Sequence, residues 1–408
     1  MKVAFFVGKF PVLSETFVIR TIVGLKKLGH EVTVIAGEWG NRDLDNKTYK
    51  EFELEKITKV VRENAVGRQN RIRIIMAFLI SACINHRKWK QLAAALRALF
   101  SGSTAAFLDI AAQSPRGEIG EYDAIIAHFG FCGVRVMYLQ EAGLLQGKFA
   151  TFFHGLDVSH RDVLLKNMTN YQRLFQHSGM LLPVSKYFAA QLIQFGAPET
   201  KIRVLPMGVE TDHISHLPFG RPTHSPLRVL TVGRLTEKKG IEYAINGVGL
   251  VRHPIELTII GGGPREKQLR SLAKETCLHP VTFMGEQPPH RVVSALSDAD
   301  VFLLPSVTAG TGDTEGCPVA IQEAMAMGLL VIATRHGGIP DLIEDGVSGF
   351  LVSERSPEEI ANVLQQICEG KVDRENLRQA ARTTIEQNFS ASKLDLQLQS
   401  ICEQLKSK

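Results

Sequence analysis

The stretch LRVLTVGRLTEKKGIEYAINGVGLVRHPIELTIIGG, residues 227–262, decides the fold class. A short apolar run at 227–233 ends in glycine, residues 240–251 carry apolar side chains at helical spacing, and a second apolar run fills 255–262. Continuous apolar strands that alternate with helices are typical of a parallel sheet with helices on both faces. The stretch therefore predicts one β-α-β unit of an α/β domain.

The same alternation extends over most of the chain. Further strands are predicted at 2–7, 30–37, 122–129, 148–155, 179–185, 201–208, 281–286, 301–306, 329–334 and 349–352. Helices are predicted at 14–29 with Ser14 as N-cap, at 265–276, 290–298 and 318–327, from Pro357 and from Glu375. Because 408 residues exceed one ordinary hydrophobic core, we predict two doubly wound, Rossmann-like domains that face each other across a cleft.

The boundaries follow from composition. Residues 1–208 form the first domain, the Pro-, His- and Gly-rich segment 209–226 is a linker, and residues 227–385 form the second domain. The last segment, 386–408, is a helix that we expect to cross back to the first domain. Ligands of such sheets bind beyond the carboxyl ends of the strands, so the cleft between the domains is the expected site.

Composition excludes several protein classes. Hydrophobic residues make up 44% of a chain whose net charge is +5, which indicates a globular protein and is too little charge for a nucleic-acid partner. Six scattered cysteines without a CxxC pair are expected to be reduced core residues, which favours a cytoplasmic location. The apolar run at 3–7 is too short for a signal peptide and predicts a buried first strand.

An insertion at about 64–108 departs from this average. It contains seven Arg or Lys residues and no Asp or Glu, and its longest apolar run, IRIIMAFLISACI (72–84), is shorter than the about 20 residues of a spanning helix. A basic amphipathic hairpin at an anionic membrane surface is one interpretation. The other is a helical insertion packed on its own domain, with a solvated basic face.

Two acids and two bases stand at predicted strand ends. Glu315 lies in the loop after the strand at 301–306, and Glu323 lies inside the helix for which Pro318 fits the first position. Carboxylates accept hydrogen bonds from sugar hydroxyl groups, and the N–H groups around Gly316 and Cys317 favour an anion or a hydroxyl oxygen. Glu315 as a helix cap and Glu323 as a solvated side chain are the structural alternatives.

The loop after the strand at 227–233 supplies the positive charge. Arg234 and Lys239 are suited to clamp a diphosphate, and Gly233 lets the backbone approach closely. Ordinary solvated loop cations are the alternative. Because no DxD, HExxH or cysteine cluster offers metal-ligand spacing, we expect no metal in the site.

Three weaker candidates come from the first domain. Gly8 ends the first predicted strand, where a ligand oxygen could lie against the backbone, and His154 and Asp157 end the strand at 148–155 at the expected cleft. Neither GGGP (261–264) nor VGKFPVLSETF has GxGxxG spacing, which disfavours a dinucleotide-dependent dehydrogenase.

Taken together, these motifs resemble those of the family 4 retaining glycosyltransferases, which have the two-Rossmann GT-B fold. The likeness covers nearly the whole chain and is greatest to exopolysaccharide enzymes of the colanic acid and amylovoran type. It rests on GKFPVLSETF, FHGLD, LPVSKY, KIRVLPMGVE, VGRLTEKKG, IIGGGPREKQLR, VTFMGE and EGCPVAIQEAMAMG, the last of which fits the family's E-x7-E signature.

The resemblance implies a role for each candidate residue. Glu323 would bind the ribose hydroxyl groups, Glu315 the donor sugar, and Arg234 and Lys239 the diphosphate. His154 would contact the transferred sugar. Further residues implied in binding are Gly8, Asp157, Gly233, Gly262, Phe283, Met284, Gly316, Cys317, Pro318 and Val319. The loop 307–313 departs from the family pattern, which leaves the role of Asp313 open.

The resemblance also implies the substrates. The donor would be a nucleotide diphosphate sugar, with a UDP-linked hexose or uronic acid as the first expectation, and no separate cofactor. The acceptor in the N-terminal domain would be a polyprenyl-diphosphate-linked oligosaccharide, which suits a protein at the inner face of the cytoplasmic membrane in exopolysaccharide or capsule biosynthesis. A nucleotide-sugar epimerase on the same fold and a non-catalytic nucleotide-sugar-binding membrane scaffold remain the alternatives.

Overall fold

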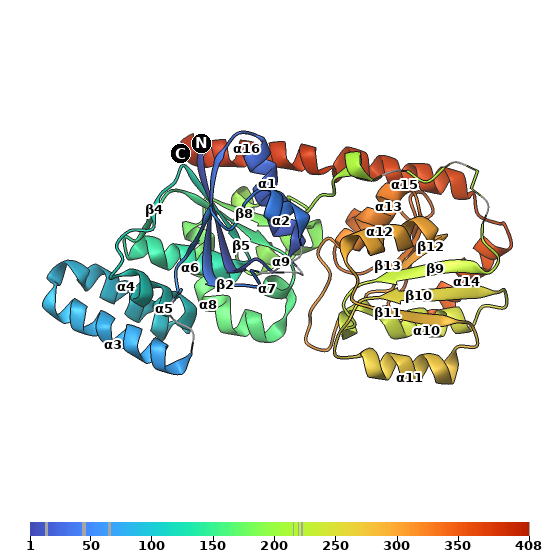
Figure 1. Ribbon diagram of the computed structural model, residues 1–408, viewed down its shortest axis with the longest axis horizontal. Helices are drawn as coiled ribbons and strands as arrows, with labels where there is room; N and C mark the ends of the chain where they lie inside the picture. Colours follow the sequence, from blue (N-terminus) through green and yellow to red (C-terminus); the bar gives the residue numbers. More distant parts are fainter. Residues whose placement is uncertain are drawn as a thin grey trace. The chain divides into compact units, whose positions relative to one another are not determined.

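The computed structural model describes residues 1–12, 15–42, 46–63, 67–214, 216–218, 220–221 and 223–407. The chain divides into two compact units. Unit 1 comprises Met1–Val184, Phe188–Leu205 and Asp395–Lys408, and unit 2 comprises Ser185–Tyr187 and Pro206–Leu394. Each unit has its own six-stranded sheet (Figure 1). The predicted α/β class with two Rossmann-like sheets is therefore confirmed.

The sheet of unit 1 is parallel throughout and has the order β3-β2-β1-β5-β7-β8. Its strands are β1 (Lys2–Phe10), β2 (Glu31–Trp39), β3 (Thr58–Val60), β5 (Ala124–His128), β7 (Phe149–Phe153) and β8 (Met180–Pro183), and β4 (Gly120–Glu121) pairs separately with β6 (Leu145–Gln146). Its helices are α1 (Thr16–Lys27), α2 (Lys47–Glu51), α3 (Arg68–Ile84), α4 (Trp89–Phe100), α5 (Thr104–Gln113), α6 (Gly130–Glu141), α7 (Leu156–Ser159), α8 (Arg161–His177), α9 (Lys186–Gln194) and α16 (Ala391–Ser407), with short 3-10 turns at His86–Lys88 and Glu199–Lys201.

The sheet of unit 2 repeats this order as β11-β10-β9-β12-β13-β14. Its strands are β9 (Leu227–Val232), β10 (Ile255–Ile260), β11 (Val281–Gly285), β12 (Val301–Leu304), β13 (Leu330–Thr334) and β14 (Phe350–Val352). Its helices are α10 (Ile241–Gly249), α11 (Glu266–Thr276), α12 (Pro289–Asp298), α13 (Val319–Met327), α14 (Pro357–Cys368) and α15 (Arg374–Asn388), with 3-10 turns at Thr211–His213, Glu237–Lys239 and Ile339–Asp341.

Alternate residues of β9 show why this sheet is covered on both faces. Val229 packs in a cluster with side chains of α10, α11 and α14, whereas Leu230 packs in a second cluster with side chains of α12, α13 and α15. Figure 1 shows these two helix layers on opposite sides of the sheet. Because successive strand residues point to opposite faces, both faces need apolar residues, which explains the continuous apolar runs.

Several sequence predictions need correction. Gly8 does not end the first strand, because β1 stays paired with β2 as far as Phe10. The segment 201–208 is not a strand: it makes one isolated bridge, Leu181↔Ile202, beside β8. Cys83 is exposed rather than a core residue, although all six cysteines are free. The proposed N-cap Ser14 lies outside the described residues.

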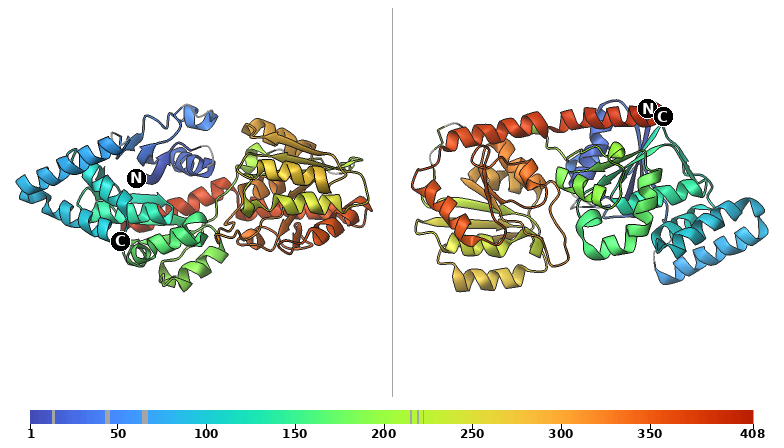
Figure 2. Two further views of the ribbon diagram at one scale, coloured as in Figure 1. Left: turned by 90° about the horizontal axis from the view of Figure 1, so that it is seen from below. Right: turned by 180° about the vertical axis from the view of Figure 1, so that it is seen from behind.

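The basic insertion forms the helices α3, α4 and α5, which Figure 2 shows projecting beyond the sheet of unit 1. Residues 64–66 of the insertion and the side chain of Arg87 lie outside the description. Among the described helices, none is long and apolar enough to span a bilayer.

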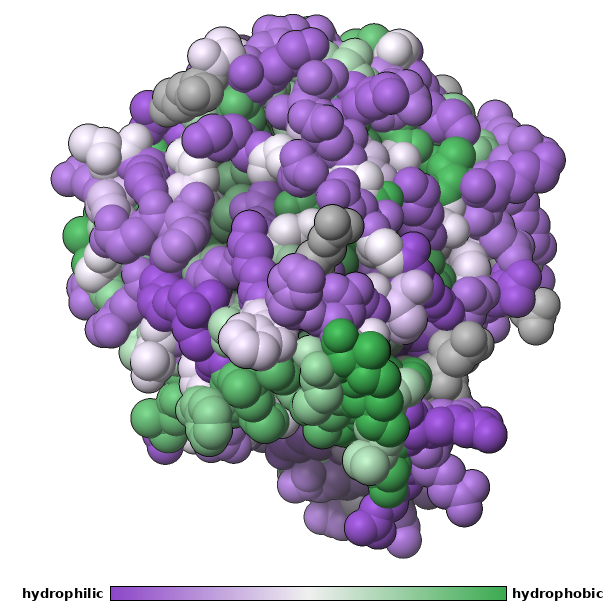
Figure 3. All heavy atoms as spheres, turned by 90° about the vertical axis from the view of Figure 1, so that its left-hand side faces the viewer, coloured by the Kyte–Doolittle hydropathy of each residue, from purple (hydrophilic) through white to green (hydrophobic). Residues whose placement is uncertain are grey.

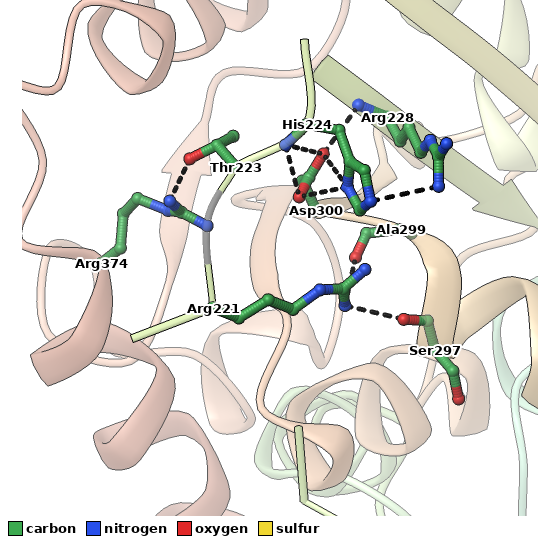
Figure 4. A network of polar contacts seen from close by, with 8 residues as sticks. All are labelled: Arg221, Thr223, His224, Arg228, Ser297, Ala299, Asp300 and Arg374. Atoms are coloured by element: carbon green, nitrogen blue, oxygen red, sulfur yellow. Dashed lines mark hydrogen bonds and ion pairs between the residues drawn. The ribbon is translucent and has the colours of Figure 1, made fainter. Parts of the chain in front are cut away.

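The proposed linker belongs to unit 2, and a polar network holds its C-terminal part to the rest of the unit (Figure 4). The buried carboxylate of Asp300 accepts hydrogen bonds from the backbone N–H of Arg228 at 3.0 Å and contacts His224 Nδ1 at 3.0 Å. Arg221 donates to the carbonyl oxygens of Ser297 and Ala299. These contacts fix Arg221, His224 and Arg228 at the amino end of the sheet.

We expect Asp300→Asn to destabilise unit 2 by about 1–3 kcal/mol, because an amide offers one acceptor oxygen where the carboxylate serves two neighbours. Denaturant unfolding followed by far-UV circular dichroism measures the change. Asp298→Asn is the matched control, since Asp298 is exposed at the end of α12 and should shift stability by less than about 0.5 kcal/mol. Equal effects of the two substitutions would contradict a role for the network.

Candidate functional site

The candidate site of unit 2 lies where the strand order reverses. In the order β11-β10-β9-β12-β13-β14, the connections from β9 and β12 leave to opposite sides, and such a switch point opens a crevice at the carboxyl ends of the strands. The loop after β9 carries Gly233, Arg234 and Lys239, and the loop after β12 carries Glu315. The topology thus brings these two loops to neighbouring strand ends.

Lys239 and Glu315 meet there as an ion pair. Lys239 Nζ lies 2.8 Å from Glu315 Oε1, and both side chains are largely buried. Burial opposes ionisation of Glu315, but the ammonium groups of Lys239 and then Lys238 outweigh it and lower the pKa of this carboxyl to about 2. Glu315 is therefore an anion at neutral pH. A carboxylate has about four lone-pair sites, so the ion pair leaves acceptor capacity for a ligand.

His336, which the sequence analysis missed, positions Glu315. The backbone N–H of Glu315 donates to His336 Nε2 at 3.0 Å, and His336 Nδ1 lies 2.7 Å from Glu354 Oε1. A side chain on Gly337 or Gly338 would collide with the backbone of Glu315 or Gly316, and Gly337 has a φ of +51°. The signal was present in the sequence, since TRHGG (334–338) follows a strand of the same sheet.

The loop 307–313 is tied to the lysine loop. Asp313 forms an ion pair with Lys238 at 3.1 Å, and the backbone N–H of Gly310 donates to Glu237 Oε1 at 3.0 Å. Burial disfavours the charge on Lys238, but Glu315 and Asp313 raise its pKa overall. These contacts give Asp313 a structural function in holding the loop.

Arg234 contrasts with the two lysines. Its side chain is exposed, and within the described part of the chain no ion pair or hydrogen bond engages its guanidinium group. It lies close enough to Lys238 for the two positive charges to oppose each other. An exposed guanidinium beside like charges is a ready donor for an anionic ligand.

Glu323 lies in the second turn of α13. The helix begins at Val319 with Pro318 as its N-cap, which corrects the prediction that Pro318 is its first residue. The Glu323 side chain is partly buried, and burial raises its pKa to about 7. No partner for its carboxylate is recorded in the described ranges, and no contact joins it to Lys239 or Glu315. Neighbouring groups therefore do not offset the cost of burying this carboxylate, and a structural role does not explain why Glu323 occupies this position.

Of the other residues predicted around the start of α13, Cys317 has a protein partner. Cys317 Sγ lies 3.0 Å from Gln322 Nε2, and burial raises the pKa of this thiol to about 12. The thiol is therefore neutral and unreactive at physiological pH. Gly316, Pro318 and Val319 precede or open the helix, whose first N–H groups lack intrahelical acceptors.

The predicted base-binding residues are only partly brought together. Gly262 follows β10, and a side chain there would press on Glu286 after β11. Phe283 packs under the guanidinium group of Arg270 from α11, whereas Met284 lines a cavity of about 350 Å³ on the side of α12. Neighbouring strand residues point to opposite faces, so Phe283 and Met284 cannot present their side chains to one base.

In unit 1, His154 pairs with a second histidine. His154 Nε2 lies 3.0 Å from His128 Nδ1, and both rings lie against Phe17 and Phe152. Burial lowers the pKa of His128 to about 3 and holds the pKa of His154 well below its usual value. His154 is therefore a neutral hydrogen-bonding group. His128 was not identified from sequence, although it also ends a strand.

Asp157 serves the backbone of unit 1. Its buried carboxylate accepts hydrogen bonds from the N–H groups of His154 and Gly155 at 3.0 Å and of Gly130 at 2.7 Å. These bonds hold the turn that carries His154 and the start of α6. Asp157 therefore positions His154, and a ligand contact of its own stays a prediction.

Gly8 has no tight neighbour inside the protein. A Cβ atom there would lie 3.8 Å from Cys132 Sγ, which is ordinary contact. Packing within the described residues therefore does not require glycine. Glu15, in the loop that follows β1, is a second carboxyl group whose pKa burial raises to about 7, and it was not a candidate in the sequence analysis.

We expect Lys239→Met to destabilise unit 2 by as much as about 3 kcal/mol, because it removes the cation that pairs with the buried Glu315 anion. The ion pair contributes stability above the ordinary Glu pKa, and this contribution is lost as the pH falls toward about 2. Denaturant unfolding at pH 7 measures the loss. Adding Glu315→Gln should restore much of it, and a purely additive double variant would contradict the pairing.

No group of three or more His, Cys, Asp or Glu side chains that could hold a metal ion was found among the residues that the structure describes.

Family models match both units. The model described as "Glycosyltransferase Family 4" matches residues 14–213, and the model described as "Glycosyl transferases group 1" matches residues 219–384. The chain is 37% identical over 413 residues to a protein of Salmonella typhimurium named as a colanic acid biosynthesis glycosyltransferase. It is 34% identical over 410 residues to an amylovoran biosynthesis glycosyltransferase of Erwinia amylovora. Each alignment covers 99% of this chain and 100% of the relative.

Solved structures agree on the fold. The HepE protein of Anabaena, solved with UDP and glucose, has a TM-score of 0.71 at 17% identity and covers 99% of this chain and 100% of its own. A sucrose-phosphate synthase of Thermosynechococcus elongatus has a TM-score of 0.72 at 17% identity, with 100% and 99% covered. At such low identity these likenesses show the architecture, which is GT-B.

Proposed function

The chain belongs to glycosyltransferase family 4 and is a glycosyltransferase, and from that premise we propose that it moves a hexose or uronic acid from a UDP-sugar to a lipid-linked oligosaccharide in exopolysaccharide biosynthesis. The observation that carries this proposal is the paired Lys239–Glu315 beside the exposed Arg234 at the switch point of unit 2. Two neighbouring loops there supply positive charge and an ionised acceptor.

The charges suit the chemistry of the donor. Breaking the anomeric C–O bond leaves negative charge on the departing diphosphate, and Arg234, Lys239 and the N–H groups at the start of α13 are suited to stabilise it. Ionised Glu315 is suited to accept hydrogen bonds from the sugar, and Glu323 from the ribose. Retention of anomeric configuration is the outcome we propose, with the departing phosphate accepting the proton of the acceptor.

Relatives guide the choice of donor and acceptor. The names of the two full-length relatives support a product of the colanic acid or amylovoran type. The Anabaena structure with UDP-glucose makes UDP-sugars the first donors to test. A relative that shares 31% identity over 45% of this chain is named as a GDP-mannose-dependent mannosyltransferase, so GDP-mannose is the second.

The test combines binding with product analysis. Thermal-shift measurements on the full chain with UDP-glucose, UDP-galactose, UDP-glucuronic acid and GDP-mannose should show stabilisation by one UDP-sugar. NMR of the product formed on a polyprenyl-diphosphate oligosaccharide should then show the donor's anomeric configuration. An epimerised sugar formed without acceptor would favour the epimerase, and stabilisation without turnover would favour the scaffold.

A further inference from the structure

Helix α3 turns a row of large apolar side chains to solvent. Only Phe78 and Ala82 of its seventeen residues are buried. Spaced four residues apart along one side are Ile72, Met76, Ile80 and Ile84, which are 52%, 54%, 55% and 80% exposed. Residues at this spacing are neighbours on a helix surface, so the row is continuous.

Helix α4 also exposes large apolar side chains. It packs on unit 1 through the small side chains of Ala94, Ala95 and Ala98, while Trp89 and Phe100 are 64% and 85% exposed. A surface helix of a globular protein normally buries its large apolar residues and exposes its polar ones. The exposed side of α4 is therefore adapted to an apolar environment outside the unit.

The two helices together form one surface, which we call the hairpin face: Ile72, Met76, Ile80, Ile84, Trp89, Leu96, Leu99 and Phe100. Figure 3 views the molecule from the side on which α3 and α4 lie and shows hydrophobic side chains gathered in a band. Contiguous apolar bands of this kind mark interaction sites on soluble proteins.

Exposed positive charges lie on the helices that carry this face. Arg68, Arg73 and Lys90 are exposed on the same two helices, and no acidic residue occurs between positions 64 and 108. Arg97 is partly offset by Glu141, whose carboxylate lies 3.4 Å from Arg97 Nε. Exposed apolar side chains and cations on the same two helices complement an anionic lipid surface, where headgroups are negative and acyl chains lie beneath them.

We propose that the hairpin face docks on an anionic phospholipid bilayer, with α3 and α4 lying in the plane of the headgroups. Neither helix has the length and hydropathy to cross the bilayer, so the apolar row reaches only the headgroup boundary. The basic residues attract the protein to the anionic headgroups over a long range, and the apolar side chains then insert between the lipids. The binding strength of an interfacial helix scales with the apolar area that it buries and with its attraction to anionic lipids. The docking does not depend on which sugar is transferred.

The test is binding of the full chain to vesicles of phosphatidylglycerol and phosphatidylcholine, measured by co-sedimentation. We expect binding that needs phosphatidylglycerol and weakens in high salt. Ile84→Asp/Phe100→Asp should lower the partition coefficient at least about tenfold, since each substitution removes an inserted apolar group. Arg73→Gln/Lys90→Gln should lower it about fivefold per charge. Both pairs are exposed, so neither should change the melting temperature.

A second readout identifies the surface that docks. Fluorescence of Trp89 should shift to the blue on vesicle addition, and Trp89→Phe should abolish the shift although Trp39 remains. Leu278→Asp is the matched control, because Leu278 is 99% exposed but lies in unit 2. This variant should bind vesicles as the unchanged protein does. Equal loss in this control, or unchanged binding of the hairpin variants, would overturn the proposal. The proposal would also be overturned if the unchanged protein did not bind vesicles but formed a dimer, and if the Ile84→Asp/Phe100→Asp variant were a monomer.

Discussion

Replacing Arg234 by alanine should lower kcat by on the order of 100- to 1000-fold, the cost of removing one group aimed at charge that develops in a transition state. The same variant should keep its melting temperature. Arg234 is exposed and has no recorded partner in the described residues, so its removal leaves no buried group unpaired. Initial rates with saturating UDP-sugar and thermal unfolding provide the two measurements.

A matched control separates Arg234 from general loss of positive charge. Arg252 is also exposed in unit 2, but it precedes β10 and so lies at the amino end of the sheet. Arg252→Ala should therefore retain full activity. If Arg234→Ala turned over donor at the unchanged rate, the phosphate-clamp assignment would be wrong. A drop in melting temperature would instead assign Arg234 a structural role.

The fold was predictable because its signal is repeated along the chain. Each β-α-β unit carries an apolar strand, a glycine-containing loop and a periodic helix, and strands such as β9 and β12 are apolar on both faces. A wrong prediction for one element then leaves the predicted fold class unchanged, because the other units support it. Where the signal is local, prediction failed: 201–208 is apolar enough for a strand, yet Pro206 interrupts it and it makes one bridge beside β8.

The site was predictable in residue type but not in pairing. Sequence placed Lys239 and Glu315 at strand ends, but their ion pair depends on the strand order and on loop conformations that spacing does not specify. For the same reason His336 was missed, since its contact with Glu315 spans twenty-one residues. The backbone hydrogen bonds of Asp157 were not predicted, because a carboxylate at a strand end can serve a ligand or the backbone.

Replacing Glu323 by glutamine should lower kcat/KM for the donor by about 100-fold and yet stabilise the protein above neutral pH. The activity loss follows if the carboxylate accepts two hydroxyl hydrogen bonds, each worth about 1.5–3 kcal/mol when charged. The stability gain follows from desolvation. Burial raises the pKa of Glu323 to about 7 from an ordinary 4.5, so the folded protein binds a proton that the unfolded chain releases between these values.

The raised pKa of Glu323 predicts how the stability of the protein changes with pH. Stability of the unchanged protein should fall as pH rises from about 4.5 to about 7, because the desolvated carboxyl group must ionise, whereas Glu323→Gln has no such group. Denaturant unfolding should therefore show equal stability at pH 4.5 and a more stable variant at pH 8. Glu275→Gln is the control, since Glu275 is exposed in α11 and should leave both values unchanged. If Glu323→Gln were less stable than the unchanged protein at pH 8, Glu323 would have a structural role. Lower activity together with higher stability would instead identify a carboxylate that binds a ligand and destabilises the fold.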